Sequence, residues 1–92
     1  ALPNKFFDYI HAGLPQINVN YPEYKKMNDQ YDVAILLNDL SPENIAEKIN
    51  NLLENDVLYK RLRNNCIKAR SVLNWQNEQK ILLNFYQSLF NN

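Results

Sequence analysis

The chain has 92 residues, which is enough for one small domain with little margin for burying a core. Hydrophobic residues make up 46% and charged residues 22%, a composition typical of a globular chain rather than a disordered one. The formal net charge is zero, which argues against a nucleic-acid binder, because such domains are usually clearly basic. The single cysteine, Cys66, excludes an intrachain disulfide and cannot build a metal site by itself.

Two further features bear on the class of protein. No uninterrupted apolar run is long enough to span a membrane, and the first residues do not form a signal-peptide pattern. The chain has one glycine, Gly13, whereas complete α/β enzymes use many glycines at turns and phosphate loops. Because the sequence also starts without methionine inside an ordered-looking motif, we expect a fragment of a larger protein, with residues 1–92 as one unit.

The first helix is expected over residues 4–12. Asn4 can cap it, because its side-chain oxygen can accept a bond from a free backbone N–H of the first turn. Gly13 can end the helix by adopting a positive φ, and Pro15 prevents any continuation.

Two strand candidates follow this helix. Residues 16–19 form a short strand candidate with two β-branched side chains, and residues 33–37 form a continuous apolar run. A brief helix is expected between them over residues 22–30. The alternation through residues 1–40 predicts βα units on a parallel sheet, although two short strands are too few for an independent sheet.

Residues 41–92 are expected to form three helices. Ser41 is the expected cap of the first, with Pro42 at its first position, while Asp56 and Asn74 are the expected caps of the second and third. Apolar residues recur at helical spacing along each, namely Ile45, Ile49, Leu52 and Leu53, then Leu58, Leu62, Cys66, Ala69 and Leu73, then Leu82, Phe85 and Leu89 with Tyr86 beside them.

The start of the first helix is the best candidate for chemistry. A helix N-terminus offers unpaired N–H groups that suit a phosphate, and Lys5 could add a cation for a diphosphate. Asp8, one turn further on, could accept hydrogen bonds from sugar hydroxyls. The alternative is that Lys5 and Asp8 are solvated surface residues.

Other candidates have a structural and a functional interpretation. His11 could approach a phosphate or sugar, but a lone histidine is more often structural or exposed to solvent. Cys66 lies on an apolar stripe and is interpreted as core. Glu23, with Tyr24 beside it, follows the first strand, where ligand crevices form. A basic cluster is interpreted as a solvated helix face rather than a binding patch; it comprises Lys60, Arg61, Arg63, Lys68 and Arg70.

Residues 3–17, PNKFFDYIHAGLPQI, resemble a segment of the retaining group 1 glycosyltransferases, commonly called family 4. The family's helix reads acid, hydrophobic, two variable residues, then Ala-Gly-x-Pro and two hydrophobic residues, which corresponds to residues 8–17. Residues 3–5, Pro-Asn-Lys, are similar to a subgroup that acts in bacterial surface-polysaccharide assembly. Residues 40–46 resemble the family's Pro-Glu helix start, and residues 74–86 resemble its Trp-to-Tyr tail.

The resemblance implies roles for individual residues. Family members use two acids separated by seven residues, of which the second contacts the nucleotide ribose; Asp8 occupies that second position, and the first would fall one residue before Ala1. Asn4 and Lys5, at the helix start, would face the donor diphosphate. The family usually has Glu at the position of Asp8 and an apolar residue at that of Gln16. No residue of this chain matches a catalytic position.

As a whole, the resemblance implies an α/β fold, a partial Rossmann-like fragment from the distal part of a GT-B carboxyl-terminal domain, with a helical second half. The parent would move a sugar from a nucleotide diphosphate donor to a glycan or lipid-linked acceptor, in the cytoplasm at the inner face of the membrane. It would need no cofactor or metal besides this donor substrate. The chain alone would be inactive, because the first acid and the acceptor domain are missing.

Two alternatives remain at this point. The chain could be a small helical interaction module, because the exposed edges of a short sheet and uncovered apolar faces favour self-association. It could also be a fragment of another GT-B enzyme, such as a nucleotide-sugar epimerase.

Overall fold

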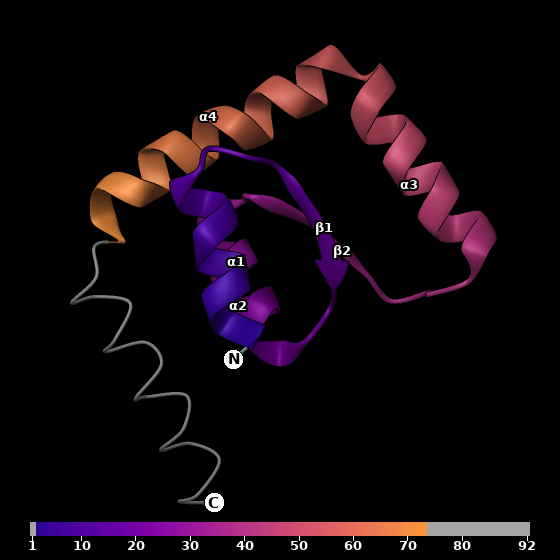
Figure 1. Cartoon of the computed structure of the whole chain (residues 1–92), viewed down its shortest axis with the longest axis horizontal. Coiled ribbons are helices and arrows are strands. Elements are labelled where there is room, and N and C mark those ends of the chain that lie inside the picture. The colour runs from indigo at the N-terminus through magenta and orange to yellow at the C-terminus, as the bar shows by residue number, and fades with distance from the viewer. Residues whose placement is uncertain (1, 74–92) are drawn as a thin grey trace, which may run out of the picture.

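The computed structural model of the chain describes residues 2–73, which form four helices and a two-stranded sheet (Figure 1). In chain order these elements are α1 (Leu2–His11), β1 (Gln16–Val19), α2 (Pro22–Tyr31), β2 (Ala34–Leu37), α3 (Pro42–Glu54) and α4 (Asp56–Val72). The predicted order of elements is confirmed this far. The last predicted helix, with Asn74 as its cap and its face of Leu82, Phe85, Tyr86 and Leu89, lies outside the described residues.

The two strands are parallel, with register running from Gln16 opposite Ala34 to Val19 opposite Leu37. Helix α2 connects them, so β1, α2 and β2 form the predicted βαβ unit. The chain is therefore a mixed α/β protein in which helix predominates over residues 2–73.

One face of the sheet packs on α1 and α2. Ala34 is buried and Leu36 packs against the same apolar cluster as Phe6 of α1 and Tyr24 of α2, whose rings stack at a centroid distance of 4.7 Å. The side chains of a strand alternate between faces, so Ile17 and its register partner Ile35 point to the other side of the sheet. The buried members of the cluster are Phe6, Phe7, Ile10, Tyr24, Met27, Val33, Ala34, Cys66, Ala69 and Leu73.

Gly13 terminates α1 as predicted, but the helix ends at His11, one residue before the predicted end, and begins earlier than predicted. Gly13 adopts a φ of 69°, and the amides of Gly13 and Leu14 donate to the carbonyls of Ile10 and Tyr9, each at 3.0 Å. The helix begins at Leu2, so the prediction that Asn4 caps it is wrong. A proline is tolerated in the first turn, because its missing N–H is one that the helix leaves free, and Pro3 therefore does not delay the start.

The caps of α3 and α4 are set by local side chains. Ser41 caps α3 as predicted, its Oγ accepting from the amide of Asn44 at 3.3 Å. The predicted cap of α4, Asp56, is wrong by one residue: Asn55 is the cap, and its Oδ1 accepts from the amide of Leu58 at 3.0 Å. Asn55 already has an extended backbone, so its side chain reaches that amide and leaves Asp56 as the first helical residue.

Helix α4 covers the core, whereas α3 stands apart (Figure 1). α4 packs against both α1 and α2, and α3 packs mainly against α4. The apolar stripe predicted for α4 is confirmed, with Leu62, Cys66, Ala69 and Leu73 buried and Leu58 half-buried. The stripe predicted for α3 is only partly buried, because Leu52 is in the core while Ile49 is 42% and Leu53 is 68% exposed.

Candidate functional site

The starts of α1 and α2, which carry several of the sequence candidates, lie together at the end of the sheet where both strands finish. The N-terminal end of α1 lies beside the start of α2, just beyond the end of β1 (Figure 1). Stacking of Phe6 on Tyr24 joins these two helix starts, and Tyr21 lies 5.7 Å from Tyr24 between ring centroids. The carboxyl edge of a parallel sheet is where open α/β folds bind ligands, so this is the candidate site.

Lys5 and Asp8 are both exposed on α1. At 100° per residue they share the face opposite to the buried Phe6, Phe7 and Ile10. Neither side chain has a hydrogen bond or an ion pair with another described residue. Both are therefore available to a ligand, and both are equally consistent with a solvated surface.

Glu23 lies in the first turn of α2 and is half-buried. Burial of Tyr24, followed by the negative charge of Glu23, raises the pKa of the Tyr24 phenol. Asn4 is in the first turn of α1, followed directly by Lys5, so the structure brings the helix starts that carry Asn4, Lys5 and Glu23 to one edge, with Asp8 further along α1.

Two asparagines at this edge were not predicted from the sequence. Asn20 follows β1, Asn38 follows β2, and Nδ2 of Asn20 donates to Oδ1 of Asn38 at 2.7 Å. The Oδ1 atom of Asn20 is buried and has no hydrogen-bond partner. A buried acceptor without a partner is costly, so this oxygen is suited to receive a donor from water or a ligand hydroxyl. The signal was present in the sequence as a polar residue directly after each strand.

His11 lies at the opposite end of α1 and bridges two helices. Its Nδ1 is 2.9 Å from the carbonyl oxygen of Phe7, and its Nε2 is 2.7 Å from that of Leu73 at the end of α4. The carbonyl of His11 in turn accepts from Nη1 of Arg70 at 3.2 Å. His11 thus has the structural role that the sequence favoured, and the structure does not bring it to the carboxyl edge.

Cys66 is fully buried, which confirms its predicted place in the core. Its Sγ lies 3.8 Å from the carbonyl oxygens of Leu14 and Val33. Burial raises the pKa of the thiol, because removal from water disfavours the charged thiolate. A thiol held neutral in the core is a poor nucleophile and a poor metal ligand.

The basic residues of α4 are all exposed, as predicted for a solvated face. They do not act as one group. Nε of Arg61 pairs with Oδ2 of Asp32 at 3.1 Å, whereas Arg63 and Arg70 have no acidic partner among the described residues. Arg63 and Arg70 lie on a different side of α4 from Arg61.

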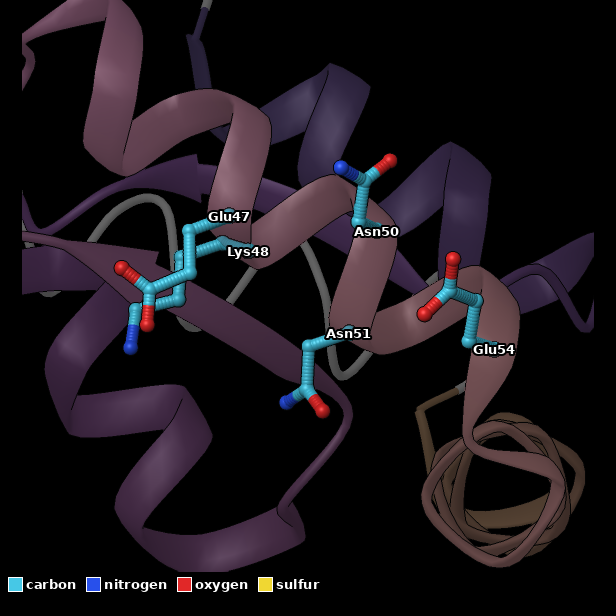
Figure 2. A pocket seen from close by; sticks show the side chains of 5 residues that line it. All are labelled: Glu47, Lys48, Asn50, Asn51 and Glu54. Carbon is cyan, nitrogen blue, oxygen red and sulfur yellow. The ribbon is translucent and has the colours of Figure 1, made fainter.

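A hollow with a volume of about 430 Å³ lies along α3. Figure 2 shows its five lining side chains, all from α3: Glu47, Lys48, Asn50, Asn51 and Glu54. These side chains extend in different directions from a single helix, so no group of them converges on one ligand atom. We assign no site to this hollow.

Two further kinds of site are absent from the described part of the chain. Over residues 2–73, no three His, Cys, Asp or Glu side chains are grouped so that they could hold a metal ion. No helix in this range combines the length and apolar character needed to cross a membrane.

Comparison of the chain with models of protein families, with curated proteins and with solved structures finds no match. The resemblance to family 4 glycosyltransferases therefore rests on the sequence motifs alone. Its implications for function stay predictions.

Proposed function

We propose that this chain is the distal part of the donor-binding domain of a retaining glycosyltransferase. The parent enzyme would transfer a sugar from a nucleotide diphosphate donor to a glycan or lipid-linked acceptor in bacterial surface-polysaccharide synthesis. The observation that carries the proposal is the position of Asp8. It is exposed on α1, five residues before the glycine that ends this helix, and α1 starts at the carboxyl edge of the parallel strands.

Each proposed role follows from the chemistry of the side chain. The carboxylate of Asp8 would accept hydrogen bonds from the ribose hydroxyls of the donor. The ammonium of Lys5 would lie near the diphosphate, where a cation offsets the charge that develops on the leaving group. In this proposal Asn4, in the first turn of α1, and Glu23, at the start of α2, would also contribute to donor binding. In this proposal His11 has no part in donor binding, because its ring is engaged at the other end of α1.

The open sheet supports the assignment to part of a larger domain. Each described strand has a single neighbour, so each has one edge that further strands could pair. Two-stranded sheets are marginal without additional packing. We accordingly predict no sugar transfer and no donor hydrolysis by the 92-residue chain, and robust turnover would contradict the proposal.

Nucleotide diphosphate binding tests the proposal. The chain labelled with ¹⁵N is titrated with UDP, GDP and ADP, and amide shifts are followed by NMR. We expect saturable shifts for one nucleotide at Lys5, Asp8 and Asn20. Asp8→Ala should weaken that binding about tenfold, the value of one hydrogen bond to a charged group.

The matched control is Asp29→Ala. Asp29 is also an exposed helical aspartate, paired only with the exposed Lys25 at 2.7 Å, and it lies at the far end of α2. Its loss should leave affinity within about twofold, since exposed pairs contribute little. Equal affinity in the wild type and Asp8→Ala, or no binding of any nucleotide, would contradict the proposed function.

A self-association module is the second candidate, favoured by exposed apolar side chains. Leu53 and Val57 are 68% and 80% exposed at the corner between α3 and α4. Such side chains are commonly covered by a partner. Light scattering over a range of concentrations distinguishes the two candidates: a dimer without nucleotide affinity supports the module, and a monomer that binds nucleotide supports the donor domain.

A further inference from the structure

A second hollow lies between the turn after α1 and the middle of α4, with a volume of about 260 Å³. Its two sides have different chemistry. The turn contributes residues 12–14, and α4 contributes residues spaced three or four apart, which places them on one helix face. The lining residues are Ala12, Gly13, Leu14, Tyr59, Arg63, Ile67 and Arg70.

The charge that the described residues give this hollow is positive. Arg63 and Arg70 both line it, and over residues 2–73 no acid is among the lining residues. The neighbouring Arg61 instead pairs with Asp32 at 3.1 Å. Arginines without acidic partners, facing the same space, are the residues that proteins use to bind phosphate, because a guanidinium offers several N–H donors in one plane.

The hollow is held in shape by the turn. Nη1 of Arg70 donates to the carbonyl of His11 at 3.2 Å, which fixes one end of its guanidinium, and its other N–H groups bond to no described residue. Gly13 has no side chain, and a Cβ there would contact Nη1 of Arg70 at 3.7 Å and Cγ1 of Ile67 at 3.8 Å. Glycine therefore keeps open the space directly beside the Arg70 guanidinium.

We propose that this hollow binds a diphosphate group, with Arg63 and Arg70 each holding one phosphoryl unit. The two arginines are seven residues apart, so their Cα atoms are separated by about 10 Å along the helix. Two arginine side chains that start about 10 Å apart can each reach a different charged group of the same anion. An anion with two charged groups therefore fits this spacing better than an anion with one. The volume lies below that of typical pockets for drug-sized ligands, which favours a small anion over a whole nucleotide.

This site is separate from the proposed donor site. The hollow adjoins the turn that follows α1, whereas Lys5 lies nearer the start of this helix. Asp8 is in the last turn of α1 and is not among the residues that line the hollow. Variants of the arginines and variants of Asp8 therefore test different regions of the molecule. Either proposal can fail without the other.

The test is titration of the 92-residue chain with sodium pyrophosphate in low-salt buffer, followed by calorimetry and by ¹⁵N amide shifts. We expect saturable binding with the largest shifts at Gly13, Leu14 and Arg63. Arg63→Gln should weaken binding about tenfold, which is typical of losing one charge-assisted contact. Arg63 makes no bond to another described residue, so this variant should fold normally.

The control is Arg61→Gln, which removes the same charge from the same helix. It should change the affinity by less than about twofold, because its partner Asp32 lies outside the hollow. Orthophosphate should bind at least about fivefold more weakly than pyrophosphate, since it has one phosphoryl unit. Absence of saturable binding, equal losses in the Arg61 and Arg63 variants, or shifts confined to Lys5 and Asp8 would overturn the proposal.

Discussion

Asn28 of α2 joins this helix to the start of β2, and its removal should unfold the βαβ unit more readily than any other single polar change. Its Oδ1 accepts from the amides of Val33 and Ala34 at 2.8 and 2.9 Å, and its Nδ2 donates to the carbonyl of Ala34 at 2.9 Å. Val33 and Ala34 are buried, so water cannot replace the lost partner. At about 1 kcal/mol for each of three hydrogen bonds, Asn28→Ala should cost about 3 kcal/mol.

Urea unfolding followed by far-UV circular dichroism measures this cost. Asn28→Asp keeps the acceptor for both amides, but its second carboxyl oxygen faces the carbonyl of Ala34 and can donate to it only when protonated. At a pH low enough to protonate this carboxyl, its cost should lie between those of the wild type and Asn28→Ala. This variant also gives a result if Asn28→Ala is unfolded without urea. Asn50→Ala, an exposed position on α3, is the control and should cost less than about 0.5 kcal/mol. Equal free energies of unfolding for Asn28→Ala and Asn50→Ala would refute the reasoning.

Two further predictions concern the core and the α1 turn. Because burial raises the pKa of the Cys66 thiol, its contribution to stability is complete below the ordinary thiol pKa and is lost as the pH rises through the raised value. The free energy of unfolding of the wild type should therefore fall above about pH 8.5, and that of Cys66→Ala should fall less over the same range. Parallel curves of unfolding free energy against pH for the two proteins would contradict this. Gly13→Ala should cost about 1 kcal/mol because of the φ of 69°, and Gly13→Asn should cost less, since asparagine tolerates positive φ. Equal thermal midpoints for these two variants and the wild type would show that the positive φ of Gly13 does not cause the loss of stability.

Signals that act within a few residues predicted the fold well. The strand at 16–19 is found with its predicted bounds, and the strand expected over 33–37 begins one residue later. Gly13 and Ser41 end and begin their helices as expected. The cap of α4 was misplaced because Asn55 and Asp56 are both good capping residues, and only the backbone conformation selects between them.

Features that depend on distant segments could not be predicted. In the sequence, Asn28 is an ordinary polar residue of a predicted helix. Its hydrogen bonds form only because the fold places the start of β2 beside α2. The partly exposed stripe of α3 has the same origin, because helical spacing shows which side chains share a face but not whether another element covers it. At the candidate site, Lys5 and Asp8 could be identified from their positions in the sequence motif. The contact between Asn20 and Asn38 could not be predicted without the parallel register of the two strands.

The central claim is that Asp8 holds the ribose of a nucleotide diphosphate, and the affinity of the chain for that nucleotide tests it most directly. Calorimetric titration of wild type, Asp8→Ala and the control Asp29→Ala, all folded by circular dichroism, gives the comparison. We predict that Asp8→Ala binds about tenfold more weakly, while Asp29→Ala binds like the wild type. Indistinguishable affinities for all three proteins would contradict the account.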